Sequence, residues 1–161
     1  MGQSRFVYVT YIRSTPERLW RALTEPEFTR QYWGGTHQVS DWTKGSSWNI
    51  TFANGKIADS GEVLEIDLYK KLVLKWRNEF MPEMAAEGDS RMSYTIEQKG
   101  EVVKLTLVHE MPIADSKLID GVSQGWPELL ASLKSLLETG NALPDFEEPP
   151  PEMAEIIRAG S

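Results

Sequence analysis

Apolar and polar residues alternate with a period of two over most of the chain. Six such segments occupy residues 36–110 and are separated by turns that contain Gly or Asn, and a seventh lies near the N-terminus. This pattern is typical of antiparallel strands joined by short turns. We therefore predict seven strands, at 5–13, 36–42, 46–53, 61–68, 70–78, 90–98 and 101–110.

One face of the predicted sheet is apolar and the other is polar. Such a division is expected for an antiparallel sheet that is covered on one side only. The alternation assigns to the covered face Trp48, Ile50, Phe52, Leu64, Ile66, Leu68, Leu72, Leu74, Trp76, Met92, Tyr94, Ile96, Val103, Leu105, Leu107 and His109.

Two short helices are predicted after the first strand. Ser14 and Glu17 have the spacing of a capping box, and Thr24 and Glu27 repeat it, so the second helix should run to about Trp33. A longer helix is predicted near the C-terminus, where apolar residues recur every three or four positions. Because a proline disfavours helix at the residue before it, we expect a regular helix over 127–139, a looser lead-in from 115, and Gly140 as its C-cap.

These elements predict an α+β fold in one domain over residues 1–140. Residues 141–161 are proline-rich and acidic, so we expect a flexible tail there. The formal net charge of −7 argues against a nucleic-acid partner. The chain has no cysteine and two histidines, so no metal site or other cofactor is predicted. With no spanning segment or targeting signal in the sequence, we expect a cytoplasmic protein that does not enter membranes.

The order of these elements and several motifs resemble the START-like (SRPBCC) helix-grip superfamily, which includes the birch-pollen-allergen (Bet v 1-like) fold. Within it, the chain is most similar to the bacterial single-domain homologues of the activator of Hsp90 ATPase. The resemblance covers about 5–140 and implies a curved sheet that grips the C-terminal helix around a cavity for an apolar molecule. It is carried by Pro16, Leu19, Trp20, Leu23, Thr24, Trp33, the stretch 41–48 and Gly125-Trp126-Pro127.

The resulting site hypothesis places a small hydrophobic ligand between the sheet and the long helix. Tyr32 and Trp33, beside Gly34-Gly35, and the loop 78–90 are the expected rims of the cavity. Large rings can hold the walls of such a pocket apart, or they can simply fill it as core residues. The candidate ligand-binding residues are Tyr32, Trp33, Trp48, Phe52, Trp76, Phe80, Met92, Tyr94, Leu107, His109 and Trp126.

Two other functions stay open on the sequence. A cyclase or hydrolase would use His109 with Tyr94, and with Glu62 as a further inward polar group, although no complete catalytic motif is present. A chaperone-associated interaction domain with a stress-response role would instead use the outer surface. A homodimer is also possible, because the strand near 36–42 is expected to be an edge strand. We favour a binding protein over an enzyme.

Overall fold

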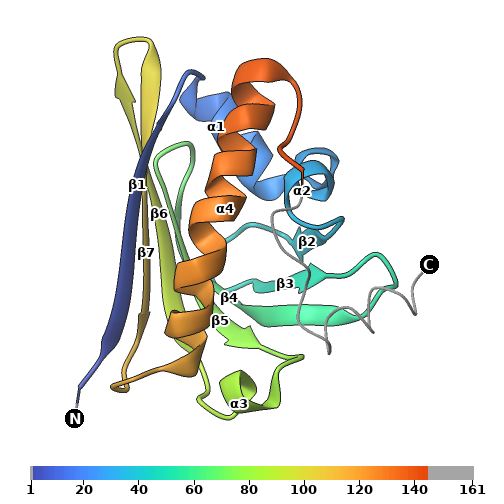
Figure 1. Ribbon diagram of the computed structural model, residues 1–161, viewed down its shortest axis with the longest axis vertical. Helices are drawn as coiled ribbons and strands as arrows, with labels where there is room; N and C mark the ends of the chain where they lie inside the picture. The colour runs from blue at the N-terminus through green and yellow to red at the C-terminus, as the bar shows by residue number, and fades with distance from the viewer. Residues whose placement is uncertain (1, 145–161) are drawn as a thin grey trace.

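The structure is a computed structural model that describes residues 2–144 of the chain. The predicted tail therefore lies outside the described residues from position 145 onward. Figure 1 shows a sheet with the long helix α4 (Lys117–Thr139) lying along one side and two short helices near one end. The α+β helix-grip fold predicted from the sequence is confirmed.

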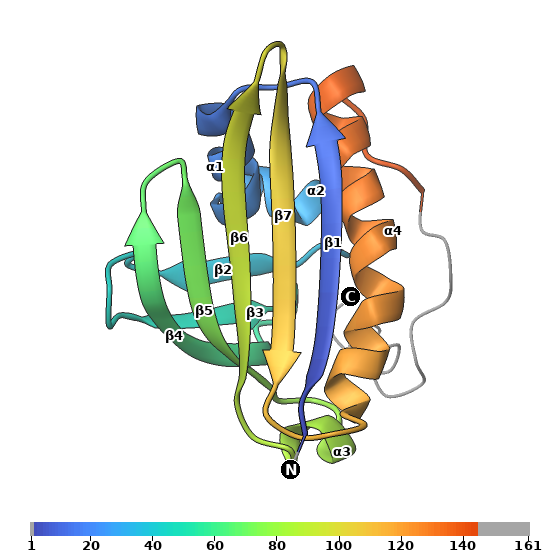
Figure 2. The same cartoon turned by 90° about the vertical axis from the view of Figure 1, so that its left-hand side faces the viewer.

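All seven predicted strands are present and form one antiparallel sheet in the order β1-β7-β6-β5-β4-β3-β2. Figure 2 shows that the sheet is strongly curved, because β2 and β3 run across the direction of β1, β6 and β7. β1 and β2 are its two edges. The strands are β1 (Ser4–Ile12), β2 (His37–Ser40), β3 (Ser47–Thr51), β4 (Ile57–Asp67), β5 (Lys71–Asn78), β6 (Ser90–Lys99) and β7 (Val102–Met111).

Helix α4 packs on the β1 and β7 end of the concave face. It is one continuous helix, so the predicted looser lead-in is wrong. Its first turn is stabilised because Ser116 Oγ accepts a hydrogen bond from the Ile119 N–H at 3.1 Å. Pro127 lies inside the helix and does not end it, while Gly140 closes it with a φ of 87°, as predicted.

The two short helices are α1 (Pro16–Thr24) and α2 (Pro26–Tyr32), and their predicted caps are wrong. Thr15, rather than Ser14, caps α1 by accepting a hydrogen bond from the Arg18 N–H at 3.2 Å. Thr24 is the last residue of α1 and donates to the Trp20 carbonyl at 2.9 Å, so it cannot cap α2. The helices persist because their buried faces pack on the core, which short helices require.

β4 contains an irregularity that the alternation did not predict. The register of β4 against β5 shifts between Val63 and Glu65, so Leu64 is the additional residue of a bulge. A bulge reverses the faces of all residues on one side of it. As a result Asp59, Gly61 and Val63 lie opposite inner-face residues of β5, and Glu62 lies opposite Lys75 on the outer face. The prediction that Glu62 points inward is therefore wrong.

Two further differences concern turns. Leu68, predicted on the covered face, lies in the turn after β4 and is 57% exposed. The loop between β5 and β6 contains a short helix, α3 (Pro82–Ala85), that was not predicted.

In the part of the chain that the structure describes, no helix has the length and apolar character needed to cross a membrane.

Candidate functional site

Most of the predicted ligand-binding aromatic residues meet in one cluster between the sheet and α4. The ring centroids of Trp48 and Trp76 are 4.6 Å apart, and Trp126 of α4 lies 5.7 Å from Trp76. Trp33, the C-cap residue of α2, lies 5.5 Å from Trp126. Tyr94 and His109 also contact Trp126, at 6.2 Å each, and Tyr32 lies 6.1 Å from Trp33. We call these seven residues the aromatic cluster.

The remaining predicted residues lie around this cluster. Met92 pairs with His109 across β6 and β7, and Leu107 pairs with Tyr94, and both Met92 and Leu107 are fully buried. Phe52 and Phe80 form a separate pair with centroids 5.5 Å apart. Trp33 and Phe80 are only half-buried, so they are the predicted residues closest to solvent.

Each buried indole N–H of the aromatic cluster donates to a buried polar side chain. Trp48 donates to Gln38 Oε1 at 2.8 Å, and Trp76 donates to Asp59 Oδ1 at 2.9 Å. Trp126 donates to His109 Nδ1 at 3.2 Å. Because a buried indole without a partner would be costly, these acceptors fix the orientations of the rings. Gln38 and Asp59 were not among the predicted site residues.

Both ring nitrogens of His109 are occupied. Since Nδ1 accepts from Trp126, the proton lies on Nε2, which donates to Ser90 Oγ at 2.7 Å. Ser90 Oγ in turn donates to the Trp76 carbonyl at 3.1 Å. Burial lowers the pKa of His109 to about 3. The imidazole is thus neutral at ordinary pH and hydrogen-bonded on both sides, as in a structural core residue.

Tyr94 differs from its neighbours because its hydroxyl is buried without a partner. Among the buried side-chain polar atoms that the structure describes, this hydroxyl and Ser14 Oγ have no hydrogen bond. Burial raises the pKa of Tyr94 well above its ordinary value. Tyr32, whose pKa is also raised by burial and then by Tyr94, instead donates to the Ala22 carbonyl at 2.7 Å. An unpaired buried hydroxyl costs about 1–3 kcal/mol.

Asp59 is a buried acid that the sequence analysis missed. Its Oδ1 also accepts from Asn78 Nδ2, at 3.3 Å. The pKa of Asp59 is raised to about 7, chiefly by burial and to a smaller extent by the nearby carboxylate of Glu79, while the hydrogen bonds from Trp76 and Asn78 act in the opposite direction. The β4 bulge explains the omission, because regular alternation would place Asp59 on the outer face.

The loop 79–89 is held at both ends by polar side chains. At its start, Asn78 Oδ1 accepts from the Phe80 and Met81 N–H groups at 3.2 and 2.7 Å. Towards its end, the Glu87 carboxylate caps the first turn of α4. It accepts from Ser116 Oγ at 2.6 Å and from the Lys117 and Leu118 N–H groups at 2.7 and 3.3 Å.

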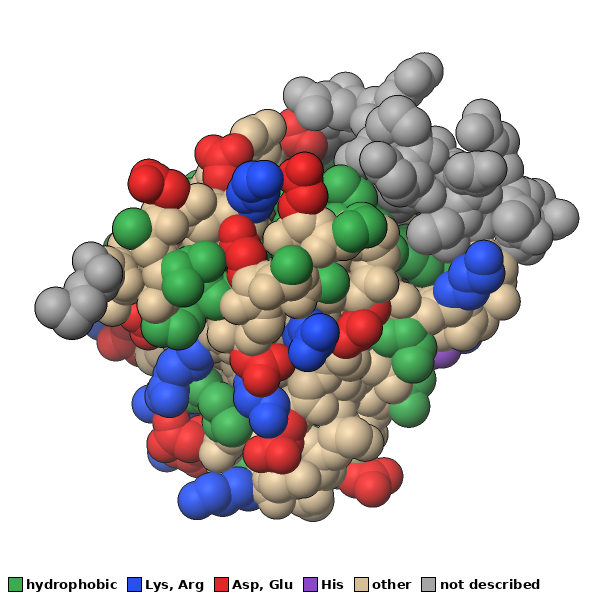
Figure 3. Space-filling model, turned by 90° about the horizontal axis from the view of Figure 1, so that it is seen from below, with side chains coloured by type: hydrophobic (Ala, Val, Ile, Leu, Met, Phe, Trp, Pro, Cys, Tyr) green, Lys and Arg blue, Asp and Glu red, His purple; other side chains and the backbone are tan. Residues whose placement is uncertain are grey.

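A pocket of about 430 Å³ lies away from the aromatic cluster. It is formed where the first residues of β1 meet the start of α4, and it is lined by polar residues such as Arg5, Asp115 and Asp120. Figure 3 shows this end of the molecule, where charged and hydrophobic side chains are mixed over the surface.

Within the described chain, no group of three His, Cys, Asp or Glu side chains is placed to hold a metal ion.

The family model described as activator of Hsp90 ATPase homolog 1-like protein matches residues 13–138. None of the curated proteins matches the chain in sequence.

Solved structures share the fold. Protein MLL2253 from Mesorhizobium loti is 24% identical with a TM-score of 0.70, over 83% of this chain and 96% of that one. The Aha1 dimer from Colwellia psychrerythraea is 18% identical with a TM-score of 0.69, over 85% of this chain and 98% of that one. PFC0360w, an HSP90 activator from Plasmodium falciparum, is 22% identical with a TM-score of 0.66, over 83% of this chain and 95% of that one. On the strength of the family match, which extends over most of its length, the chain belongs to the activator of Hsp90 ATPase homolog 1-like family.

Proposed function

We propose that the protein binds a small, largely apolar molecule between the concave face of the sheet and α4. The observation that carries this proposal is the unpaired hydroxyl of Tyr94 inside the aromatic cluster. A ligand that brings one hydrogen-bonding group to this hydroxyl would recover the free energy that the empty state loses. The ligand class is therefore an aromatic or alicyclic compound with a single polar group.

Ligand entry requires the rings of the cluster to move, because they contact one another in this structure. Trp33 and Phe80 are the half-buried rings at the two expected rims. Trp33 is followed by Gly34 and Gly35, whose φ values of 58° and 75° suit a tight reversal of the chain. Because these two rings are less buried than the rest of the predicted site, we expect their displacement to give a ligand access to Trp126 and Trp76.

The test compares two probes of the same shape, naphthalene and 2-naphthol, by isothermal titration calorimetry. Both should bind, and 2-naphthol should bind more tightly because its hydroxyl can pair with Tyr94. Tyr94→Phe should weaken 2-naphthol by about two- to tenfold, the equivalent of one hydrogen bond, and leave naphthalene unchanged. Native mass spectrometry of freshly purified protein should show a co-purified small molecule.

Tyr11→Phe serves as the matched control, because Tyr11 is a half-exposed tyrosine on the outer face of β1. It should leave the affinities for both probes unchanged. If neither probe binds and the native mass equals that of the chain alone, the interior is a solid core and the proposal is wrong.

The enzymatic alternative receives less support from the geometry. His109 is neutral and both of its nitrogens are hydrogen-bonded to Trp126 and Ser90, so neither is available as a base. Tyr94 has a strongly raised pKa and makes no hydrogen bond to His109. We therefore assign these two residues to structure and ligand binding rather than to catalysis.

A second candidate function is an interaction with an Hsp90-type chaperone or with a second copy of the chain. The family description and the printed names of the Plasmodium and Colwellia proteins suggest these partners. The specific observation is an apolar stripe on the outer face of the edge strand β1, where Val7, Val9 and Tyr11 are 49%, 42% and 50% exposed. Ion pairs flank it, namely Arg5–Glu110 and Arg13–Glu101. An apolar centre with a charged rim is typical of protein interfaces.

This candidate is tested with purified Hsp90 and by the mass of the free protein in solution. Val9→Lys should abolish binding to the chaperone, or dissociate a dimer, while 2-naphthol binding stays unchanged. Tyr94→Phe should leave both associations unchanged and should weaken the binding of 2-naphthol. If Val9→Lys changes neither association, the stripe is not an interface.

A further inference from the structure

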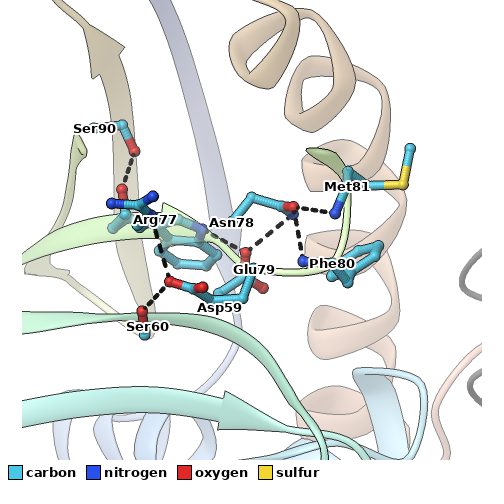
Figure 4. Close-up of polar contacts among 9 residues, drawn as sticks. Asp59, Ser60, Arg77, Asn78, Glu79, Phe80, Met81 and Ser90 are labelled. Atoms are coloured by element: carbon cyan, nitrogen blue, oxygen red, sulfur yellow. Dashed lines mark hydrogen bonds and ion pairs between the residues drawn. The ribbon is translucent and has the colours of Figure 1, made fainter. Parts of the chain in front are cut away.

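The buried carboxyl of Asp59 connects the aromatic cluster to the loop 79–89. One oxygen, Oδ1, accepts both the indole N–H of Trp76 and the amide of Asn78. The oxygen of the same Asn78 amide, Oδ1, accepts hydrogen bonds from the backbone N–H groups of Phe80 and Met81. Figure 4 shows Asn78 lying between Asp59 and this backbone. Two side chains thus span the distance from the centre of the cluster to its rim.

The two ends of this connection differ in exposure. Trp76 is buried at the centre of the cluster, in contact with Trp48, Trp126 and His109. Phe80 is half-buried and rests against Phe52. A change at Asp59 therefore acts on an interior ring and on a rim residue together.

We propose that Asp59 is a positioning residue that sets the closure of the interior, holding Trp76 and the Phe80 loop in place while it is protonated and loosening both when it is ionised. The inference rests on the proposed function for its effect on a ligand. Its effect on Trp76 does not require a ligand.

The surroundings of Asp59 favour its neutral form. Burial raises the pKa of Asp59 to about 7, so its charge changes near neutral pH. The facing residue of β3 is Ile50, which is uncharged. From the β5 side, Glu79 raises the pKa of Asp59, while Arg77 lies 3.6 Å from Glu79 and Ser60 Oγ donates to Glu79 at 2.7 Å. No cation is among the groups that act on the pKa of Asp59 in the described chain.

The physical consequence follows from the cost of a buried charge. An ionised carboxylate in an apolar site attracts water unless a positive group compensates it. The hydrogen bonds from Trp76 and Asn78 favour the ionised carboxylate, but burial opposes the charge more strongly. Ionisation should therefore favour an opened arrangement in which water reaches Asp59 and the start of the loop is released. An apolar ligand should therefore bind more tightly below pH 7 than above it, and it should dissociate faster above pH 7.

The first measurement uses the intrinsic tryptophan fluorescence of the free protein between about pH 5.5 and pH 8.5. A change in emission with a midpoint near pH 7 is expected in the wild type and should be absent in Asp59→Asn. The asparagine keeps the Oδ1 acceptor and cannot ionise. Glu79→Gln, a change at a partly exposed residue, should shift the midpoint to lower pH.

The second measurement uses the affinity for naphthalene, a probe that does not titrate. In the wild type, the dissociation constant should rise several-fold from about pH 5.5 to about pH 8.5, and in Asp59→Asn it should stay constant. Glu62→Gln, which removes an outer-face carboxylate of the same strand, and His37→Gln, which removes the other imidazole, are controls and should behave like the wild type.

The outcomes separate the two proposals. If neither naphthalene nor 2-naphthol binds at any pH, the proposed function fails, yet the fluorescence transition still tests Asp59. If naphthalene binds with the same pH profile in the wild type and in Asp59→Asn, the function stands and this inference is wrong. A transition near pH 7 that Asp59→Asn keeps, or that Glu79→Gln does not move, also overturns it.

Discussion

At the scale of single residues, the interior is organised by three buried acceptors, one for each central indole. Gln38 serves Trp48, Asp59 serves Trp76 and His109 serves Trp126. Gln38 is itself anchored, because its Nε2 donates to the Leu23 carbonyl at 2.5 Å. Burying these three polar side chains costs little free energy because each one is hydrogen-bonded.

Two of these acceptors titrate with opposite effects on stability. The folded pKa of His109 is about 3, below the ordinary value of 6.5, so the unfolded chain binds more protons between these values. The stability that neutral His109 contributes is complete above about pH 6.5 and is lost as the pH falls towards 3. The folded pKa of Asp59 is about 7, above 3.8, so its contribution is complete below about pH 4 and is lost as the pH rises towards 7.

The free energy of unfolding should reveal both effects in single variants. Relative to the wild type, Asp59→Asn should gain up to about 1.4 kcal/mol per pH unit as the pH rises from about 4 to 6.5. The free energy of unfolding of His109→Asn, relative to the wild type, should instead fall by a similar amount per pH unit as the pH rises over this range. This slope is expected whatever the absolute stability of the variant. Urea unfolding at several pH values measures these slopes, and equal slopes for the two variants would contradict the assignment.

At the scale of secondary-structure elements, the β4 bulge and a glycine determine how closely the central rings pack. Gly61 lies between Trp48 on β3 and Trp76 on β5 in the cross-strand register. A Cβ at this position would collide with the Lys75 carbonyl. The absence of a side chain here brings β4 and β5 together and lets the two indoles approach to 4.6 Å.

Gly61→Ala should therefore destabilise the protein by about 1–3 kcal/mol, since the neighbouring strand has to move. The matched control is Gly125→Ala in α4, where an added Cβ meets open space. It should stabilise the helix by about 0.5–1 kcal/mol through its better helix propensity. Thermal unfolding compares the two, and a neutral Gly61→Ala would show that the strands are not held this closely.

The cap of α1 provides a second test at this scale. Thr15→Ala should cost about 0.5–2 kcal/mol because it removes the side-chain acceptor of the first turn. Ser14→Ala should be neutral or stabilising, because Ser14 Oγ is buried without a partner. If Ser14→Ala were the costlier change in chemical unfolding, the predicted cap at Ser14 would be right after all.

At the scale of the whole molecule, Glu87 ties the loop 79–89 to the start of α4. Its carboxylate stands where an anion is favoured, at the N-terminus of a 23-residue helix, and uses two backbone N–H groups and one hydroxyl. Near the same point, the Met84 side chain lies against Gly121 of α4. These contacts join the sheet to the helix at the end opposite α1.

Glu87→Gln should weaken this junction by about 1–2 kcal/mol, since a neutral amide is a poorer cap. Amide hydrogen exchange should then accelerate in residues 79–89 and in the first turn of α4. The control is Glu83→Gln in α3, which removes only an exposed ion pair to Lys117 and should leave exchange unchanged. Unaltered exchange in Glu87→Gln would mean that apolar packing alone holds the loop.

The sequence by itself determined the seven strands, the long helix with Gly140 as its C-cap, and the covered faces of β3, β5, β6 and β7. These features follow from local periodicity and turn residues, which act over a few positions. All seven members of the aromatic cluster were among the residues named from the sequence. Those on strands could be found because ring residues in phase on neighbouring strands point to the same side of a sheet.

Only the tertiary structure decided the inward position of Asp59, the pairing of Gln38 with Trp48, the unpaired state of Tyr94 and the capping of α4 by Glu87. The bulge at Leu64 adds one residue to a strand, and nothing in the local pattern marks where the alternation reverses. Hydrogen bonds between residues far apart in the chain likewise depend on how the strands and the helix pack. The chemistry of the interior is therefore set by packing, although the residues that line most of it can be read from their spacing.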